Sequence, residues 1–582
     1  MFIKKQKRKN GRVYLSVVQG YRDAEGRSRS KHVRSLGYLD ELEKTYDDPI
    51  THFQAGLDEE NEAAKALAAP LIVKLSRDKR IDRRADGRVE MGAAVPSAYF
   101  NRDLGIWDFF ERKRTARKSD FDPCRILELL VWNRLSDPAS KKAAWEGRGR
   151  FPRECDFSLD DVYRSLDYLN ANADALVKRM NASLEQVRGP RDRARLYYDV
   201  TNYYFEVENE DPGEEGLRKR GVCKENRPNP IVQMGLLLDG EGIPLDYDIF
   251  PGNRNDMTTL LPVMKKAGLR PKGGIDDPGR DRVIMVADKG LNTSDNIAAC
   301  TLDGNGFILS QSVRRATKKL KGWVMDEAGY EETDSGRFKV KSRISDKAVH
   351  VTGEDGRKRK VMVPVKEVAF WSKDFFERAR YERARVIEKS RAAIARGDMS
   401  GAASRSSVKY AKDKPVVKAT GERADHNWVL DEDKIAADEA MDGYYCIITS
   451  EQEMADRDII DAYRGLWRVE ESFRVLKSDF DARPVYVSRD EHIRAHFLVC
   501  YVALLIMRLI QKDVGQGHSA AEISGALHDM VGHHLDANVY HFDYRTDLTD
   551  ALCAAVGIDL SREVMTKDQM NKVMSSVKKP RN

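Results

Sequence analysis

The sequence predicts a protein of several domains built around an α/β core, and three observations support this prediction. Its 582 residues, 41% of them hydrophobic, are too many for one hydrophobic core and indicate about three or four domains. Segments typical of strands and of helices alternate between residues 190 and 310, as they do in an α/β fold. Short β-like runs and a long charged helix follow between residues 311 and 442, which we interpret as a β-rich insertion into that core.

The amino terminus is strongly basic. Residues 1–40 contain eleven Lys or Arg against three acids, a net charge of +8, whereas the whole chain carries only +6. Apolar residues alternate from 12 to 20 and return from 30 to 36 after a turn at 23–26, which predicts a basic hairpin. This concentration of charge suggests contact with phosphates, although basic termini are often merely solvated. Residues 40–90 are charged and alanine-rich, so we expect a helix and a linker there.

Between residues 99 and 184 the apolar residues follow the spacing of helices. Asp122 and Pro123 open one predicted helix, and Ser158 caps another. The segment from 190 to 310 then predicts strands at 196–201, 232–238, 243–250, 283–287 and 307–310, and helices at 258–266 and 294–300. Three strands in a meander, a helix and a further strand are the order expected for a ribonuclease-H-like core. Acids on its first and fourth strands would lie side by side.

Two aspartates occupy those two strands. Asp199 lies within the aromatic and β-branched run at 196–201, and Asp288 follows a continuous apolar run that indicates a strand buried on both faces. An ionised acid on a buried strand needs a partner, and a strand that ends in a Gly turn is where α/β folds expose reactive groups. Either residue alone would more often be a strand-end cap or a turn residue. Together with one more carboxylate they would form a metal-binding trio.

The third acid is Glu470, which stands midway between Tyr463 and Lys477 at steps of seven residues. Seven residues are almost two helical turns, so the three side chains form one line on a predicted helix. Apolar residues recur at helical spacing beside this line and include Leu466, which places that side chain in the core. A glutamate flanked by an amine and a phenol suits a metal ion and a phosphate. The alternative is a solvated helix flank.

The expected insertion separates Asp288 from Glu470 by 182 residues. It contains β-like runs at 349–351 and 361–365, a charged helix at 375–395 and a small, polar stretch at 397–427 that predicts a mobile loop. Residues 444–448 then resume the core. Trp371 is the aromatic residue to single out, because an exposed indole can stack on an unpaired base; the alternative is burial in the core.

These residues resemble the DDE transposases of bacterial insertion sequences, in particular the branch whose third acid lies in a Y-x2-R-x3-E-x6-K signature. The resemblance covers roughly residues 190–510 and includes Tyr198-Asp199-Val-Thr, Phe250-Pro-Gly-Asn253, Ala287-Asp288-Lys-Gly and the line through Glu470. It implies a ribonuclease-H-like catalytic core interrupted by a β-rich insertion. One departure is that Leu466 occupies the position of the signature arginine. Arg468 or Arg474 would then supply the charge, with Arg474 favoured because it lies one turn from Glu470.

The resemblance also implies the chemistry. Asp199, Asp288 and Glu470 would hold two Mg²⁺ ions, for which Mn²⁺ would substitute, since oxygen ligands suit these metals. Water would cut one strand at an element end, and the released 3′-hydroxyl would attack the opposite strand or target DNA. Lys477 and Tyr463 would hold the phosphate, with help from Lys289. The expected partners are double-stranded DNA, as terminal inverted repeats and target, and a second copy of the chain in a DNA-bound homodimer.

The expected domains follow from these assignments. They are a basic hairpin and linker (1–90), a helical domain that either binds DNA or is structural (91–189), the first part of the core (190–310), the insertion (311–442), the second part of the core (443–510) and a helical carboxyl-terminal region (511–582). The two alternatives are a transposase-derived DNA-binding protein that no longer cuts, which would have lost an acid, and a metal-dependent nuclease with the same core.

Several classes of protein are excluded by composition. The longest apolar run, 497–507, is shorter than the roughly 20 residues that span a bilayer and predicts a buried helix. The first residues have no apolar core for a signal peptide. Seven cysteines without a C-x-x-C pair argue against a disulfide framework and a zinc site. The adjacent His533 and His534 would diverge on a helix, so we assign them no metal. We therefore expect a cytoplasmic protein that binds no membrane.

Overall fold

The computed structural model divides into two compact units, Met1–Asp82 and Arg83–Asn582. It describes residues 1–8, 11–22, 28–66, 78, 80, 82–83, 85–116, 120–222, 227–269, 282–333, 335–352, 357–397, 408–413, 428–515, 517–535 and 538–578.

The first unit is a three-stranded antiparallel sheet with helices. β2 pairs with β3, which confirms the predicted hairpin, and β1 adds a strand that the sequence did not predict. Leu15 and Val17 of β2 and Leu57 of α2 are fully buried and form its small core. The predicted turn at 23–26 lies outside the described residues. The elements are β1 Phe2–Lys7, β2 Val13–Arg22, β3 Ser28–Tyr38, α1 Leu39–Leu42 and α2 Pro49–Ala66.

The second unit begins with a group of helices. The two predicted helix starts are confirmed: Asp122 accepts a hydrogen bond from the Arg125 amide at the start of α5, and Ser158 forms a capping box with Asp161 at the start of α7. The elements are β4 Arg88–Glu90, α3 Ala94–Ala98, α4 Ile106–Ala116, α5 Pro123–Ser136, α6 Lys141–Glu146 and α7 Leu159–Arg188.

A nine-stranded sheet follows, in the order β10-β11-β12-β15-β9-β8-β5-β6-β7. β5, β8 and β9 are parallel to one another, whereas every other neighbouring pair is antiparallel. All five strands predicted between residues 190 and 310 are present. Their bounds are β5 Arg195–Tyr204, β6 Ile231–Leu238, β7 Pro244–Pro251, β8 Ile284–Ala287 and β9 Gly306–Gln311, with helices α8 Leu260–Lys266 and α9 Ser294–Leu302.

The strands expected in the insertion extend this same sheet. β12 pairs with β15, so the long hairpin of β11 and β12 continues the sheet beyond β9. The predicted runs were too short, because polar residues on the solvent side interrupt the apolar pattern. Of the expected loop at 397–427, only 397 and 408–413 are described. The elements are α10 Lys318–Met325, β10 Glu331–Thr333, β11 Phe338–Thr352, β12 Lys358–Ser372, α11 Lys373–Ala395, β13 Ala411–Asp413, β14 Trp428–Leu430, α12 Glu432–Glu439 and β15 Tyr444–Thr449.

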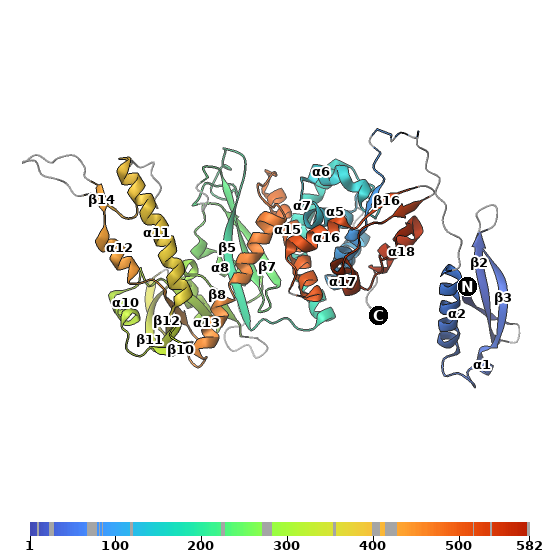
Figure 1. Ribbon diagram of the computed structural model, residues 1–582, viewed down its shortest axis with the longest axis horizontal. Helices are drawn as coiled ribbons and strands as arrows, with labels where there is room; N and C mark the ends of the chain where they lie inside the picture. Colours follow the sequence, from blue (N-terminus) through green and yellow to red (C-terminus); the bar gives the residue numbers. More distant parts are fainter. Residues whose placement is uncertain are drawn as a thin grey trace, which may run out of the picture. The chain divides into compact units, whose positions relative to one another are not determined.

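The apolar helix α15 Asp490–Val514 joins the sheet to the amino-terminal helices of this unit. It contacts α5 and α7 on one side and β7 on the other, and Figure 1 shows it between them. Its composition and length would suffice to cross a membrane, but 89% of its most apolar window is buried inside the protein. Tight packing against other elements therefore accounts for its apolar character, and the predicted buried helix is confirmed.

The carboxyl-terminal region is less helical than expected. β16, β17 and β18 form a small antiparallel sheet with β4 from the start of the unit. His533 and His534 lie on the strand β16, so the expectation that they lie on a helix was wrong. The elements are α16 Ala520–Asp529, β16 Val531–His534, β17 Val539–His541, α17 Asp547–Val556, β18 Val564–Thr566 and α18 Lys567–Ser576.

Candidate active site

Two of the predicted acids lie at matching positions on neighbouring strands. β5 and β8 run parallel, and their register pairs Tyr198 with Ala287. The next residue on each is the acid, Asp199 within β5 and Asp288 directly after the end of β8. Both residues are half-buried. The register therefore places the two acids side by side, as the strand order predicts.

Asp288 is oriented by two neutral donors. Ser310 Oγ on β9 donates to Asp288 Oδ1 over 2.9 Å, and Tyr463 Oη donates to the same oxygen over 3.1 Å. Burial, followed by the charge of Asp288, raises the pKa of the Tyr463 hydroxyl, so this group stays protonated and remains a donor. Both bonds end on Oδ1, so neither of them occupies Oδ2. Tyr463, predicted to hold a phosphate, thus supports an acid in this structure.

The segment that carries Glu470 is not the single helix that the sequence predicts. It consists of α13 Asp456–Arg464, a break at 465–466, α14 Trp467–Arg474 and the π-helix η6 Val475–Asp479. Gly465 at the break packs against Tyr197 of β5, and a Cβ at this position would collide with the Tyr197 hydroxyl. The contact joins residues far apart in the sequence. Apolar periodicity within the segment therefore does not reveal the break and predicts an uninterrupted helix.

Two contacts show how α14 and η6 lie along β5. Near the start of α14, the Arg468 guanidinium lies 5.7 Å from the centre of the Tyr197 ring. In η6, Lys477 Nζ lies 2.5 Å from Thr201 Oγ1, to which it donates. The segment from 468 to 477 therefore follows the strand in the same direction.

Glu470 lies on the segment that follows the strand of the first acid. Asp199 is midway between Tyr197 and Thr201 on the same face of β5, because alternate residues of a strand share a face. Glu470 lies between the two helical residues that contact this face and is exposed to solvent. Asp199 and Asp288 therefore lie at the same end of the parallel strands β5 and β8, and Glu470 lies on the helix that runs along β5.

The predicted phosphate ligand Lys477 lies at the edge of this site. Besides Thr201, it approaches the Tyr203 ring, with Nζ 5.4 Å from the ring centre. Lys289 is exposed in the short helical turn directly after Asp288. Lys477 of η6 thus contacts the strand that carries Asp199, and Lys289 directly follows Asp288 in the sequence. The stem of Lys477 is partly buried, so its ammonium group has a restricted position.

Leu466, at the arginine position of the signature, and the two candidate replacements, Arg468 and Arg474, have different environments. Leu466 is 8% exposed, which confirms its prediction as a core residue. Arg468 stacks over Tyr197 and, at 5.3 Å, over the exposed Trp467. Arg474 donates to Glu471 and lies 3.3 Å from an oxygen of Asp479.

Trp371 is not the exposed indole that stacking on a base would require. It is half-buried on β12, its Nε1 donates to the Asp442 carbonyl over 3.1 Å, and its ring packs against Gly443 and Phe376. These contacts favour the packing alternative for this residue.

Sequence reasoning missed two residues that touch the site. Thr201 lies two residues after Asp199 on the same strand face, and Ser310 lies near the end of β9, the next parallel strand. Strand alternation could have identified Thr201. The rule that polar groups gather at the carboxyl ends of adjacent parallel strands could have identified Ser310.

The three predicted acids offer carboxylate oxygens, the type of ligand that a hard divalent cation prefers. Asp199 and Asp288 are held by neighbouring strands, whereas Glu470 is on a helix and exposed. Within the part of the chain that the structure describes, no three His, Cys, Asp or Glu side chains lie close enough to form a preformed metal cluster.

Comparison with known protein families gives two matches. Residues 3–70 match the N-terminal domain of IS1634 family transposases, and residues 216–506 match the transposase DDE domain. The second match covers half of the chain and contains Asp288, Glu470 and Lys477, whereas Asp199 lies before it. No curated protein matches the chain.

Proposed function

The chain belongs to the DDE transposases of insertion sequences, and we propose that Asp199, Asp288 and Glu470 are its catalytic carboxylates. The family makes it a DNA-binding enzyme that cleaves DNA and transfers the cut strands. The observation that supports the assignment most is the register of β5 and β8, which juxtaposes the two aspartates. We place the chain in the branch with the Tyr463, Glu470 and Lys477 signature.

The strand order supports a ribonuclease-H-like core. β7, β6 and β5 form an antiparallel meander, and β8 and β9 follow in parallel on the other side of β5. In this proposal, residues 190–310 and 443–510 are the two parts of the core and residues 311–442 are the insertion. The remaining boundaries are 1–90 for the hairpin and linker, 91–189 for the helices and 511–582 for the carboxyl-terminal region.

DDE transposases generally require divalent metal ions, and the three carboxylates are the groups that would hold them here. We propose Mg²⁺, with Mn²⁺ as a substitute, because the set offers oxygen atoms alone. When bound, the metal supplies activation of the attacking hydroxyl and stabilisation of the leaving oxygen. Asp199, Asp288 and Glu470 would together hold the metal.

The other residues of the site orient these groups and the DNA. Ser310 and Tyr463 hold Asp288 through Oδ1 and do not occupy Oδ2. The Lys477 ammonium group would exchange Thr201 for a phosphate oxygen, a stronger, charge-assisted partner. Lys289, Arg468 and Arg474 provide further positive charge nearby. Water would attack first at an element end, and the 3′-hydroxyl that this releases would attack the opposite strand or target DNA.

The test is a cleavage assay with the purified protein, Mg²⁺ and DNA that carries the element's own ends. We expect nicks at the ends and joined products with target DNA, both dependent on the metal. Cleavage without joined products would favour the nuclease alternative, and end binding without cleavage would favour an inactive DNA-binding protein. We further propose that the active complex is a homodimer on paired ends and works on cytoplasmic DNA of the nucleoid.

Lys477→Ala should slow cleavage of bound DNA roughly 10- to 150-fold, because a charge-assisted hydrogen bond contributes about 1.5–3 kcal/mol. Tyr463→Phe should have a smaller effect, since Ser310 still donates to the same Asp288 oxygen. Single-turnover cleavage at saturating DNA measures both. Lys512→Ala, which removes an exposed lysine paired with Glu241, is the matched control. Equal rates for the Lys477 and Lys512 variants would remove Lys477 from the site.

Removing residues 1–82 should weaken DNA binding and reduce its salt dependence. The whole unit is removed because β1, β2, β3 and α2 form one compact unit, and a cut at residue 40 would strip α2 of its sheet. Each lost phosphate contact should lower the slope of log affinity against log salt concentration by about one. Fluorescence anisotropy of labelled end DNA at several salt concentrations gives the slope. An unchanged slope would show that the basic unit is only solvated.

A further inference from the structure

The end of the segment that carries Glu470 and Lys477 is held by a buried arginine from another part of the chain. Arg134 on α5 is 7% exposed. Its Nη1 donates to the Phe480 carbonyl over 2.9 Å and to the Asp481 carbonyl over 3.1 Å. Phe480 directly follows η6, so its carbonyl is among those that a helix end leaves without an internal partner, and Asp481 is the next residue along the chain.

A second buried group holds the next carbonyl. His496 Nε2 on α15 lies 3.3 Å from the Ala482 carbonyl oxygen, and His496 Nδ1 lies 3.1 Å from Lys141 Nζ. The carbonyl accepts, so Nε2 carries the proton and Nδ1 accepts from the Lys141 amino group, whose pKa burial lowers to about 7. Burial lowers the pKa of His496 well below its ordinary value, which keeps the ring in this neutral form.

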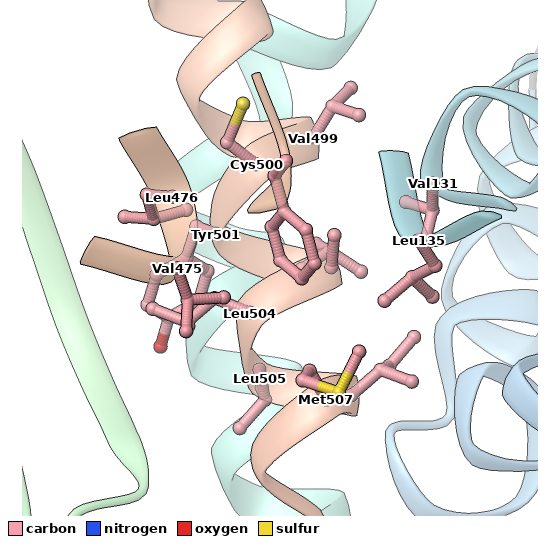
Figure 2. Close-up of a cluster of buried hydrophobic side chains, with 14 of the residues drawn as sticks. Val131, Leu135, Val475, Leu476, Val499, Cys500, Tyr501, Leu504, Leu505 and Met507 are labelled. Atoms are coloured by element: carbon pink, nitrogen blue, oxygen red, sulfur yellow. The ribbon is translucent and has the colours of Figure 1, made fainter. Parts of the chain in front are cut away.

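The same elements pack through an apolar layer. Figure 2 shows Val131 and Leu135 of α5 on one side of α15 and Val475 and Leu476 of η6 on the other. All four side chains are almost fully buried. Helix α5 and the π-helix therefore share α15 as a common support, and Arg134 connects α5 directly to the end of η6.

We propose that Arg134 is a positioning residue for Glu470 and Lys477, assisted by His496 and Lys141. The three carbonyls that these groups hold, at 480–482, begin three residues after Lys477. Asp481 has a left-handed backbone with φ of 44°, so the chain turns sharply where Arg134 holds it. This proposal rests on the proposed function, because the turn matters only if the preceding residues Glu470 and Lys477 act in catalysis.

The physical reason for a positioning role is the geometry of η6. A π-helix advances its side chains differently from an α-helix, so the direction of Lys477 depends on where η6 ends. Without the guanidinium, the carbonyl of the buried Phe480 and the carbonyl of Asp481 lose this donor, and the chain gains by shifting to satisfy them. Such a shift would move the Lys477 ammonium group away from Thr201 and turn the helix on which Glu470 lies.

The experiment compares Arg134→Met and Arg134→Lys with Arg153→Met. Arg153 is the control because its side chain is 7% exposed and donates to a backbone carbonyl, that of Met574 on α18, over 2.8 Å; it also lies 3.5 Å from the buried carboxylate of Glu128. Three quantities are measured in the full-length protein: thermal stability, amide hydrogen exchange across residues 475–482, and single-turnover cleavage at saturating end DNA and Mg²⁺.

We expect Arg134→Met to speed exchange at 475–482 and to slow cleavage about ten- to a hundredfold, with unchanged affinity for end DNA. Arg134→Lys should recover part of both, and Arg153→Met should lower stability without changing either. Wild-type exchange and cleavage in Arg134→Met, or equal slowing in Arg153→Met, would overturn the proposal.

If Arg134→Met does not fold, faster exchange at 475–482 in Arg134→Lys supports the proposal and wild-type exchange overturns it. If the wild-type protein does not cut DNA, the proposed function fails while the exchange measurement still decides whether Arg134 holds this turn.

Discussion

Asp199→Asn, Asp288→Asn and Glu470→Gln should each reduce DNA cleavage by about a thousandfold or more, because each removes a carboxylate that we propose as a metal ligand for activation of the hydroxyl. An amide keeps the shape of the side chain, so folding and binding to end DNA should persist. The effect should be the same for all three, although Asp199 lies outside the region that matches the DDE domain. That residue is therefore the most informative of the three.

The measurement is single-turnover cleavage of labelled end DNA, with thermal melting and anisotropy to confirm folding and binding. Asp458→Asn is the matched control, since Asp458 is an exposed acid in the first turn of α13, the helix before Glu470. It should cut at the wild-type rate. Near-normal cleavage by any one of the three variants would remove that residue from the active site.

Leu466→Arg should lower the free energy of unfolding by about 3–5 kcal/mol, because it buries a guanidinium with no partner. Leu466 is 8% exposed at the break between α13 and α14. The substitution restores the arginine that the family signature has at this position, so it separates two interpretations. If the position faced DNA, the variant would be stable and bind ends more tightly.

Chemical denaturation measures the stability, and Leu466→Met is the control, because it keeps an apolar side chain of similar volume and should cost less than about 1.5 kcal/mol. Arg474→Ala completes the comparison. We expect it to impair cleavage, since Arg474 is our choice for the missing charge, although its guanidinium pairs with Glu471 and Asp479 in the free protein. A stable, active Leu466→Arg protein together with a fully active Arg474→Ala protein would overturn this choice.

Local sequence determined the elements whose pattern is repeated over several residues. The alternation of β5, the apolar run of β8 and the caps at Asp122 and Ser158 all act within a few residues, so their helices and strands could be predicted. The order of the strands then sufficed to place Asp199 beside Asp288, because few topologies join a meander to a parallel strand. The buried position of Leu466 was also predicted, from periodicity alone.

Tertiary structure alone decided the features that depend on contacts between distant residues. The break at Gly465 depends on Tyr197 of β5, the partners of Asp288 come from β9 and α13, and the end of η6 is held by Arg134 of α5. The pairing of β4 with β16 likewise joins opposite ends of the second unit. Propensity and periodicity describe only a segment and its immediate neighbours, whereas these arrangements are set by which buried polar groups and packed surfaces meet once the whole chain has folded.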